Sequence, residues 1–222
     1  MDITNKGNAM TTNQVRPDGS LVSAPSGTRG LLMGNRGILL PKHFESPQPF
    51  AIKPWIACVL KDKNNLPLPK TDVKYTRLFL LDEVTAFAAG HRPCGQCQRK
   101  RYMDFVDAWC KVNRKDRSLL DDHLHGERCD SEGLKHRYVS PLCELPSGTM
   151  VEIAEGGKAH LWLRGKLFPW SVRGYGVPVS VSRDTVVQVL TPKSIVKTLQ
   201  AGFPLLLNSE TTVHPSVFAH LG

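Results

Sequence analysis

Two cysteines three positions apart form the most specific chemical pattern in the sequence. Cys94 and Cys97 enclose Gly95-Gln96, directly before a segment with helical spacing. Two thiolates at this spacing can share one zinc ion, and structural zinc has four tetrahedral ligands. The sequence contains no second close cysteine pair, so other parts of the chain must complete such a site. A thioredoxin-like redox pair requires a βαβ context that the pattern lacks, and simply buried cysteines are the third interpretation.

The other ligands of the predicted zinc site must come from distant positions. We expect Cys58, at the end of a predicted strand, to be the third ligand. Cys110 is a poor candidate, because it lies 13 residues beyond Cys97 along a helix, roughly 20 Å away. The fourth ligand stays open between a more distant residue and three histidines, His91, His123 and His125.

Short strands and two helices are predicted to position these residues. Apolar pieces at 32–34, 38–40, 55–60 and 75–80 indicate strands, and 61–65 is a turn by composition. Asp82 and Gly90 are suitable caps for a short helix between them, and a second helix follows Cys97. The charged segment 113–137 is predicted to be a helix that runs into a loop. From residue 149 onward, Gly-punctuated pieces predict a β-meander, a strand at 186–190 and a final helix that begins near Pro192.

Length and composition set the class of protein. The chain has 222 residues, 41% hydrophobic and 22% charged, which is typical of a globular fold. The first 30 residues, rich in Asn, Thr, Gly, Ser and Pro, are predicted to be a flexible segment. Residues 31–222 are predicted to form one α+β domain, with a zinc-knuckle and helical part at 31–140 and a β-meander part at 141–222. No apolar run is long enough for a membrane span and no secretory signal is visible, so we expect a cytoplasmic monomer.

The charge of the chain favours an anionic partner. Lys and Arg number 29 against 20 Asp and Glu, a formal net charge of +9. The excess is concentrated in the window 99–117, which points to phosphate contacts and hence to double-stranded DNA. Arg114 and Arg117 are phosphate candidates within this window. The residues predicted to bind nucleic acid are Asn35, Arg36, Arg92, Arg99, Arg101, Arg128, Trp170 and Tyr175. A hairpin turn explains Asn35-Arg36 equally well, and core packing explains Trp170.

The segment around the cysteine pair resembles a DNA repair domain. Residues 79–97 end in Ala-Gly-His-Arg-Pro-Cys-Gly-Gln-Cys, and this stretch is similar to the second half of the zinc domain of Ada, the adaptive-response DNA methyl-phosphotriester repair protein. The resemblance covers about 20 residues and implies that Cys94 and Cys97 bind structural zinc, with nearby basic residues facing DNA phosphates. That family's first cysteine pair is missing here, and only Cys58 lies in the corresponding region.

Over most of its length, the chain also resembles a family of bacterial proteins of similar size. The shared stretches are 32–37, 55–58, 90–97, Glu127-Arg128 and 169–171. This family is taken to include DNA glycosylases of anti-phage defence that remove glucosylated hydroxymethylcytosine. The resemblance therefore implies a DNA glycosylase that excises a modified base from phage DNA.

Base excision requires a carboxylate that stabilises the positive charge developing on the sugar, and the base must leave the stack. The segment 125–130 places His125, Glu127, Arg128 and Asp130 within six positions. We predict Asp130 or Glu127 as the catalytic carboxylate, with His125 beside it. A solvated charged loop is the alternative. Two other functions remain open: a non-catalytic, zinc-stabilised DNA-binding or regulatory module, and a small zinc-stabilised protein-interaction domain.

Overall fold

The computed structural model describes residues 12–23, 30–39, 48–60, 75–154, 156–205 and 214–220. This part of the chain contains four α-helices and two six-stranded sheets, which confirms the predicted α+β class. The helices are α1 (Glu83–Ala89), α2 (Arg99–Asn113), α3 (Leu120–Arg128) and α4 (Lys193–Gln200), and three 3-10 segments are η1 (Arg117–Leu119), η2 (Leu142–Glu144) and η3 (Pro215–His220). No described helix combines the length and the apolar character that crossing a bilayer requires.

The first sheet has the order β2-β1-β5-β3-β4-β6. Its strands are β1 (Thr12–Val15), β2 (Leu21–Ser23), β3 (Leu32–Asn35), β4 (Ile56–Val59), β5 (Leu78–Leu80) and β6 (Arg92–Pro93). The pairs β1 with β5 and β4 with β6 are parallel, and the other neighbours are antiparallel. The predicted turn at 61–65 lies outside the described residues.

Two predictions for this half were wrong. Residues 12–15 and 21–23 belong to the sheet, and Val15 is fully buried, so the flexible segment predicted for 1–30 does not hold there. The reason is long-range pairing, because β1 lies against β5. Residues 38 and 39 form no strand after β3, since the chain turns at Gly37 (φ +90°) and the backbone N–H of Leu39 donates to the Thr76 hydroxyl instead. The last residue of that predicted strand, 40, is not described.

The second sheet has the order β11-β10-β9-β8-β12-β7 and is antiparallel throughout. Its strands are β7 (Tyr138–Pro141), β8 (Thr149–Glu152), β9 (Ala159–Leu163), β10 (Lys166–Ser171), β11 (Gly174–Tyr175) and β12 (Val186–Val189). Strands β8 to β11 are the predicted meander, and β12 and α4 follow it as predicted. Helix α3 and the irregular chain after Arg128 agree with the helix running into a loop that was predicted for 113–137, and strand β7, which begins after that segment, was not predicted.

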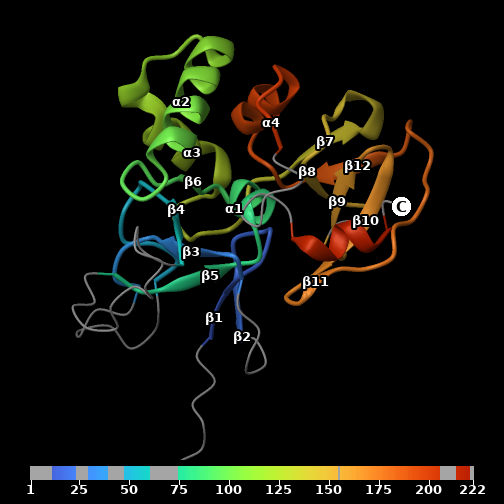
Figure 1. Cartoon of the computed structure of the whole chain (residues 1–222), viewed down its shortest axis with the longest axis horizontal. Coiled ribbons are helices and arrows are strands. Elements are labelled where there is room, and N and C mark those ends of the chain that lie inside the picture. Colours follow the sequence, from blue (N-terminus) through green and yellow to red (C-terminus); the bar gives the residue numbers. More distant parts are fainter. Residues whose placement is uncertain are drawn as a thin grey trace, which may run out of the picture.

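Helix α1 lies between the two sheets, as Figure 1 shows. It contacts β1 and β5 of the first sheet and β8 of the second, and all seven of its residues are buried. Helices α2 and α4 pack on one another beside it, around an aromatic core of Phe87, Phe105 and Phe203. The knuckle that contains Cys94 and Cys97 lies between β6 and α2, at the side of the first sheet.

Candidate metal centre and nucleic-acid interface

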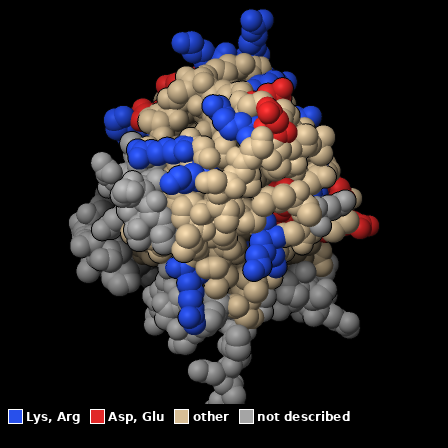
Figure 2. All heavy atoms as spheres, turned by 90° about the vertical axis from the view of Figure 1, so that its right-hand side faces the viewer, with Lys and Arg blue, Asp and Glu red and all other residues tan. Residues whose placement is uncertain are grey.

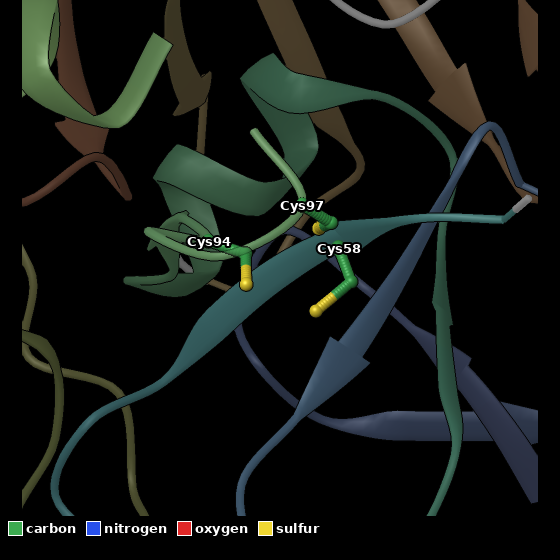
Figure 3. Close-up of side chains that lie close together, drawn as sticks. All are labelled: Cys58, Cys94 and Cys97. Atoms are coloured by element: carbon green, nitrogen blue, oxygen red, sulfur yellow. The ribbon is translucent and has the colours of Figure 1, made fainter. Parts of the chain in front are cut away.

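Strand pairing brings three cysteines together. The short strand β6 runs parallel to β4, with Arg92 beside Ile56 and Pro93 beside Ala57. The chain then turns, and the backbone N–H of Cys94 donates to the carbonyl of Ala57 at 2.9 Å. This contact places the knuckle next to Cys58 on β4, and Figure 3 shows the three cysteine side chains, Cys58, Cys94 and Cys97, gathered there.

The cysteine cluster has the geometry of a metal site. The Sγ atoms of Cys58, Cys94 and Cys97 all lie within 4.8 Å of one another. Zinc binds thiolates at about 2.3 Å, which sets sulfur atoms about 3.8 Å apart around a tetrahedron. The observed distances between the sulfur atoms therefore need to shorten only slightly for the three thiolates to bind one zinc ion. Cys94 is buried and Cys97 is exposed, so the cluster lies at the edge of the protein surface. The predicted three ligands are thus brought together, and they could hold a metal ion.

Hydrogen bonds prepare the cluster for a cation. The thiols of Cys58 and Cys97 hydrogen-bond to Cys94 and lower its pKa, and the backbone N–H of Gln96 also donates to its Sγ at 3.4 Å. The pKa of Cys58 is correspondingly raised by its hydrogen bonds to the same two cysteines. A thiolate is the form that binds metal, so one ligand of the three is favoured as the anion before any metal arrives.

None of the predicted histidines joins the cluster, which among the described residues has three possible ligands. His91 is buried, and its Nε2 accepts from Arg36 at 3.2 Å. His123 faces Glu127 at 3.3 Å on α3, and His125 contacts Arg128. These corrections share one cause: each histidine is held by a partner that its position in the sequence does not reveal. Cys110 is also absent from the cluster, as expected.

Of three arginines predicted to bind DNA near the knuckle, two are engaged in ion pairs. Arg92 makes two hydrogen bonds to Asp121, at 2.8 and 2.7 Å, and Arg101 makes two to Glu83, at 2.9 and 2.5 Å. These guanidinium groups link elements of the fold and do not present a free charge. Arg99, at the start of α2, is exposed and forms no ion pair within the described chain.

The two other predicted arginines, Arg36 and Arg128, are buried. They are 2% and 1% exposed, and both guanidinium groups lie over the ring of Trp55, at 3.7 and 4.0 Å from its centroid. Asn35 accepts the backbone N–H of Gly37 at 2.8 Å, which is the contact of a simple turn. These residues therefore do not line an exposed phosphate-binding surface.

The predicted stacking residues Trp170 and Tyr175 belong to an internal network around Asp82. The Tyr175 hydroxyl donates to the Asp82 carboxylate at 3.0 Å, and Trp170 donates to Thr85 at 3.0 Å. Asp82 also caps α1 and accepts the backbone N–H of His214 at 2.8 Å. Burial raises the pKa of Asp82 to about 6, although these hydrogen bonds favour the carboxylate. For Trp170, the alternative of core packing therefore fits the contacts, and Tyr175, which is 5% exposed, is not placed to stack on a base.

The predicted catalytic residues lie in different surroundings. Glu127 accepts from the backbone N–H of Ser194 at 3.1 Å and from its hydroxyl at 2.5 Å, and thereby caps α4. Asp130 accepts the backbone N–H groups of Glu132 and Leu134, both at 2.9 Å, within a turn. His125 packs edge-on against an aromatic ring, and its pKa is lowered by burial and by Arg128.

Glu127 lines a pocket that Asp130 and His125 do not line. The pocket has a volume of about 240 Å³. Its lining residues are Glu127, His136, Arg137, Tyr138, Pro192 and Lys193. The ammonium of Lys193 lies 5.0 Å from the Tyr138 ring centroid, and burial raises the pKa of Tyr138, so its hydroxyl stays protonated at neutral pH. Glu127, Tyr138 and Lys193 thus line one concavity.

Unpaired cations gather on the second half of the chain. Seven exposed Lys and Arg residues of the segment 141–205 form no ion pair with any described residue. They are Lys158, Arg164, Lys166, Arg173, Arg183, Lys193 and Lys197. Figure 2 views the molecule from the side of the second sheet, and this face shows more Lys and Arg than Asp and Glu. Sequence reasoning placed the phosphate contacts mainly on 99–117, and in this region it predicted Trp170 and Tyr175 to bind nucleic acid.

Comparison of the chain with protein-family models, curated proteins and solved structures finds no match. The resemblances to the Ada zinc domain and to the bacterial glycosylase family therefore stay predictions.

Proposed function

We propose that the protein is a zinc-stabilised, DNA-binding enzyme that excises a modified base, such as glucosylated hydroxymethylcytosine, from phage DNA as a glycosylase in antiviral defence. The observation that carries the proposal is the Glu127 pocket, which is lined by Glu127, Tyr138 and Lys193 together. Its volume of about 240 Å³ is slightly below the roughly 300 Å³ at which pockets for drug-sized ligands begin. This size suits a single extruded base.

The pocket supplies the groups that base excision requires. The carboxylate of Glu127, held in place by Ser194, can stabilise positive charge on the sugar and orient the attacking water. The Tyr138 hydroxyl can donate to an acceptor on the base edge, and Lys193 can contact the phosphate beside the extruded nucleotide. Asp130 and His125 do not line this pocket, so Glu127 is the preferred catalytic residue.

The proposed DNA contact rests on the unpaired cations of the segment 141–205 and on Arg99. Lys193 belongs both to this set and to the pocket, which joins the proposed phosphate-binding surface to the proposed active site. Zinc at Cys58, Cys94 and Cys97 would hold β4 and the start of α2 together, and its role in the proposal is structural.

The test is incubation of the purified protein with glucosylated hydroxymethylcytosine DNA beside unmodified DNA. Mass spectrometry detects released base, and alkali cleaves the strand at abasic sites. We expect release from modified DNA alone, and loss of release in Glu127→Gln, which keeps an oxygen to accept from Ser194. The exposed Glu132→Gln is the matched control and should keep full activity. Unaltered strands from every modified DNA tested would contradict the proposal.

A non-catalytic DNA-binding or regulatory module is the second candidate. It is favoured by the contacts of Glu127 and Asp130, because both carboxylates already have structural roles. Glu127 accepts the backbone N–H of Ser194 at the start of α4, and Asp130 closes a turn. This candidate predicts DNA binding that weakens steeply as the salt concentration rises, because the release of counterions from the DNA phosphates drives the binding. It also predicts no base release, and a Glu127→Gln protein that binds DNA as well as the original.

A further inference from the structure

A cluster of buried cations surrounds Trp55. We define the Trp55 cluster as Arg36, Trp55, His91, Arg128 and Lys135. Arg36 donates to His91 at 3.2 Å, and both arginines lie over the Trp55 ring, whose centroid is 5.3 Å from that of His91. Lys135 is half-buried and donates to the carbonyl of Ala88. Its charge acts to lower the pKa of His91 and of Cys129. Four of the five residues are less than 3% exposed.

Among the described residues, the cluster has no carboxylate partner. Every hydrogen bond that the three cations make to a described residue goes to a neutral acceptor: a backbone carbonyl of Gly19, Lys53, Ala88 or Gly90, the ring of His91 or His125, or the thiol of Cys129. No described carboxylate lies within ion-pair distance of them. A buried positive charge without an opposite charge is costly, so this arrangement is electrostatically incomplete.

Several buried N–H donors in the cluster have no partner. They are Nη2 of Arg36, Nε of Arg128, Nε1 of Trp55 and Nδ1 of His91. His91 is neutral, because burial and the two arginines lower its pKa well below the ordinary value, and with Nε2 accepting from Arg36 the proton belongs on Nδ1. Buried polar groups in folded proteins almost always have partners. Four unpaired donors beside three cations therefore call for a ligand that accepts hydrogen bonds and carries negative charge.

We propose that the Trp55 cluster is a binding site for a phosphate group. Guanidinium groups bind phosphate through parallel hydrogen bonds, and the tetrahedral oxygens offer enough acceptors for several donors at once. The turn between β1 and β2 forms the outer rim. Arg36 donates to the Gly19 carbonyl at 2.8 Å, and a methyl group built on Gly19 would lie 3.9 Å from Nη2 of Arg36, at ordinary contact distance, so the unpaired nitrogen faces this turn.

Two other groups near the cluster bear on its charge. Asp18, on the rim, accepts from the backbone N–H and the hydroxyl of Ser20 and acts on Arg36 and Lys135 from a distance. Cys129 is buried next to Arg128 and Lys135, and burial raises its pKa, so it stays a neutral thiol at neutral pH. The negative charge of the Asp18 carboxylate opposes an incoming anion. This site is separate from the Glu127 pocket and does not depend on the proposed function.

The test measures phosphate binding to the full chain by calorimetry and by thermal denaturation, in phosphate and in chloride of equal ionic strength. We expect phosphate to raise the Tm by several degrees relative to chloride. A second arm compares a 5′-phosphorylated oligonucleotide with the same strand lacking the phosphate, and a preference for the phosphorylated strand would assign the group to a nucleic-acid end. Stabilisation by inorganic phosphate alone would assign it to a small molecule. The absence of an effect in both arms would overturn the proposal.

Variants tie the binding to this cluster. Lys135→Met should weaken phosphate binding at least tenfold, whereas Asp18→Asn should strengthen it at least threefold because a repelling charge is removed. Lys100→Met, which removes an exposed cation of α2, is the control and should leave the affinity unchanged. An affinity that Asp18→Asn does not change, together with one that Lys100→Met lowers, would place the binding on the outer surface and overturn the assignment.

Discussion

Glu83 at the start of α1 and Arg101 in α2 form a buried ion pair with two hydrogen bonds, and their side chains are 5% and 12% exposed. Arg101 also donates to the carbonyl of Pro204 and lies over the ring of Phe203. The guanidinium thus joins α1, α2 and the chain beyond α4, and its charge is used within the fold.

Arg101→Met should lower the free energy of unfolding by about 3 kcal/mol, because it removes the guanidinium that makes two hydrogen bonds to the buried Glu83 carboxylate. Arg99→Met removes an exposed cation two residues earlier in α2 and should change stability by less than about 0.5 kcal/mol. Urea denaturation measures both. For DNA binding we expect the opposite result. Arg99→Met should reduce the salt dependence of the binding affinity in a titration, and Arg101→Met should not. Equal losses of stability would contradict the structural assignment of Arg101.

The three-cysteine cluster predicts that metal and stability are linked. Cys94→Ser should abolish the retention of zinc and lower the Tm, because the metal binds the folded form. Cys143→Ser, at an exposed cysteine outside the cluster, should do neither. Metal analysis of the purified protein should give one zinc ion per chain, and a chelator should lower the Tm of the original protein to that of Cys94→Ser. A chain that folds with equal stability after zinc removal would argue against the site.

Gly90 is predicted to be intolerant of a side chain. Its φ is +89°, and a Cβ there would come within 2.7 Å of the Cβ of Arg128. Gly202 has nearly the same φ, +91°, with open space around it. Gly202→Ala should therefore cost about 1 kcal/mol from backbone strain alone, and Gly90→Ala should cost at least about 1 kcal/mol more. Denaturation of the two variants side by side separates the clash from the strain, and equal costs would show that Arg128 moves freely.

Asp82 should make stability depend on pH in the acid range. Its pKa is about 6 in the fold and 3.8 as the ordinary value, because burial favours the neutral carboxyl. Between these values the folded chain binds more protons than the unfolded chain, so this group's contribution to stability falls as pH rises from about 4 to about 6. Asp82→Asn should flatten that part of the profile in denaturation measured across pH, whereas the exposed Asp184→Asn should leave the slope in place. An unchanged slope in Asp82→Asn would refute the shift.

Local signals made the knuckle and its helices predictable from sequence. Asp82 and Gly90 cap α1 as their residue types suggest, since one side chain accepts from the first turn and the other adopts a positive φ. The Cys94 and Cys97 pair needs only a tight turn, and Cys58 joins it through the pairing of β4 with β6. That third ligand was inferred from its place at the end of a strand, without knowledge of the pairing.

Features that depend on distant partners could not be predicted. Strand β1 exists because it pairs with β5 more than 60 residues later, and nothing in its own polar composition indicates this. Arg92 and Arg101 look like phosphate ligands in a basic window, yet each meets an acid that the fold supplies. Residue type gives the charge of a side chain, whereas tertiary contacts decide whether the charge is free. The Glu127 pocket likewise requires α4, whose Ser194 lies 67 residues away.

The complete burial of α1 has a consequence for hydrogen exchange. A helix that touches both sheets and exposes no residue cannot open without separating them, because each of its faces is covered by a different layer. Its backbone amide protons should consequently exchange with solvent only when the whole fold opens, at a rate set by global unfolding. Amides at the N-terminal end of α2, beside the exposed Cys97, should exchange much sooner. The slowest-exchanging protons of the molecule are therefore expected in a helix of only seven residues.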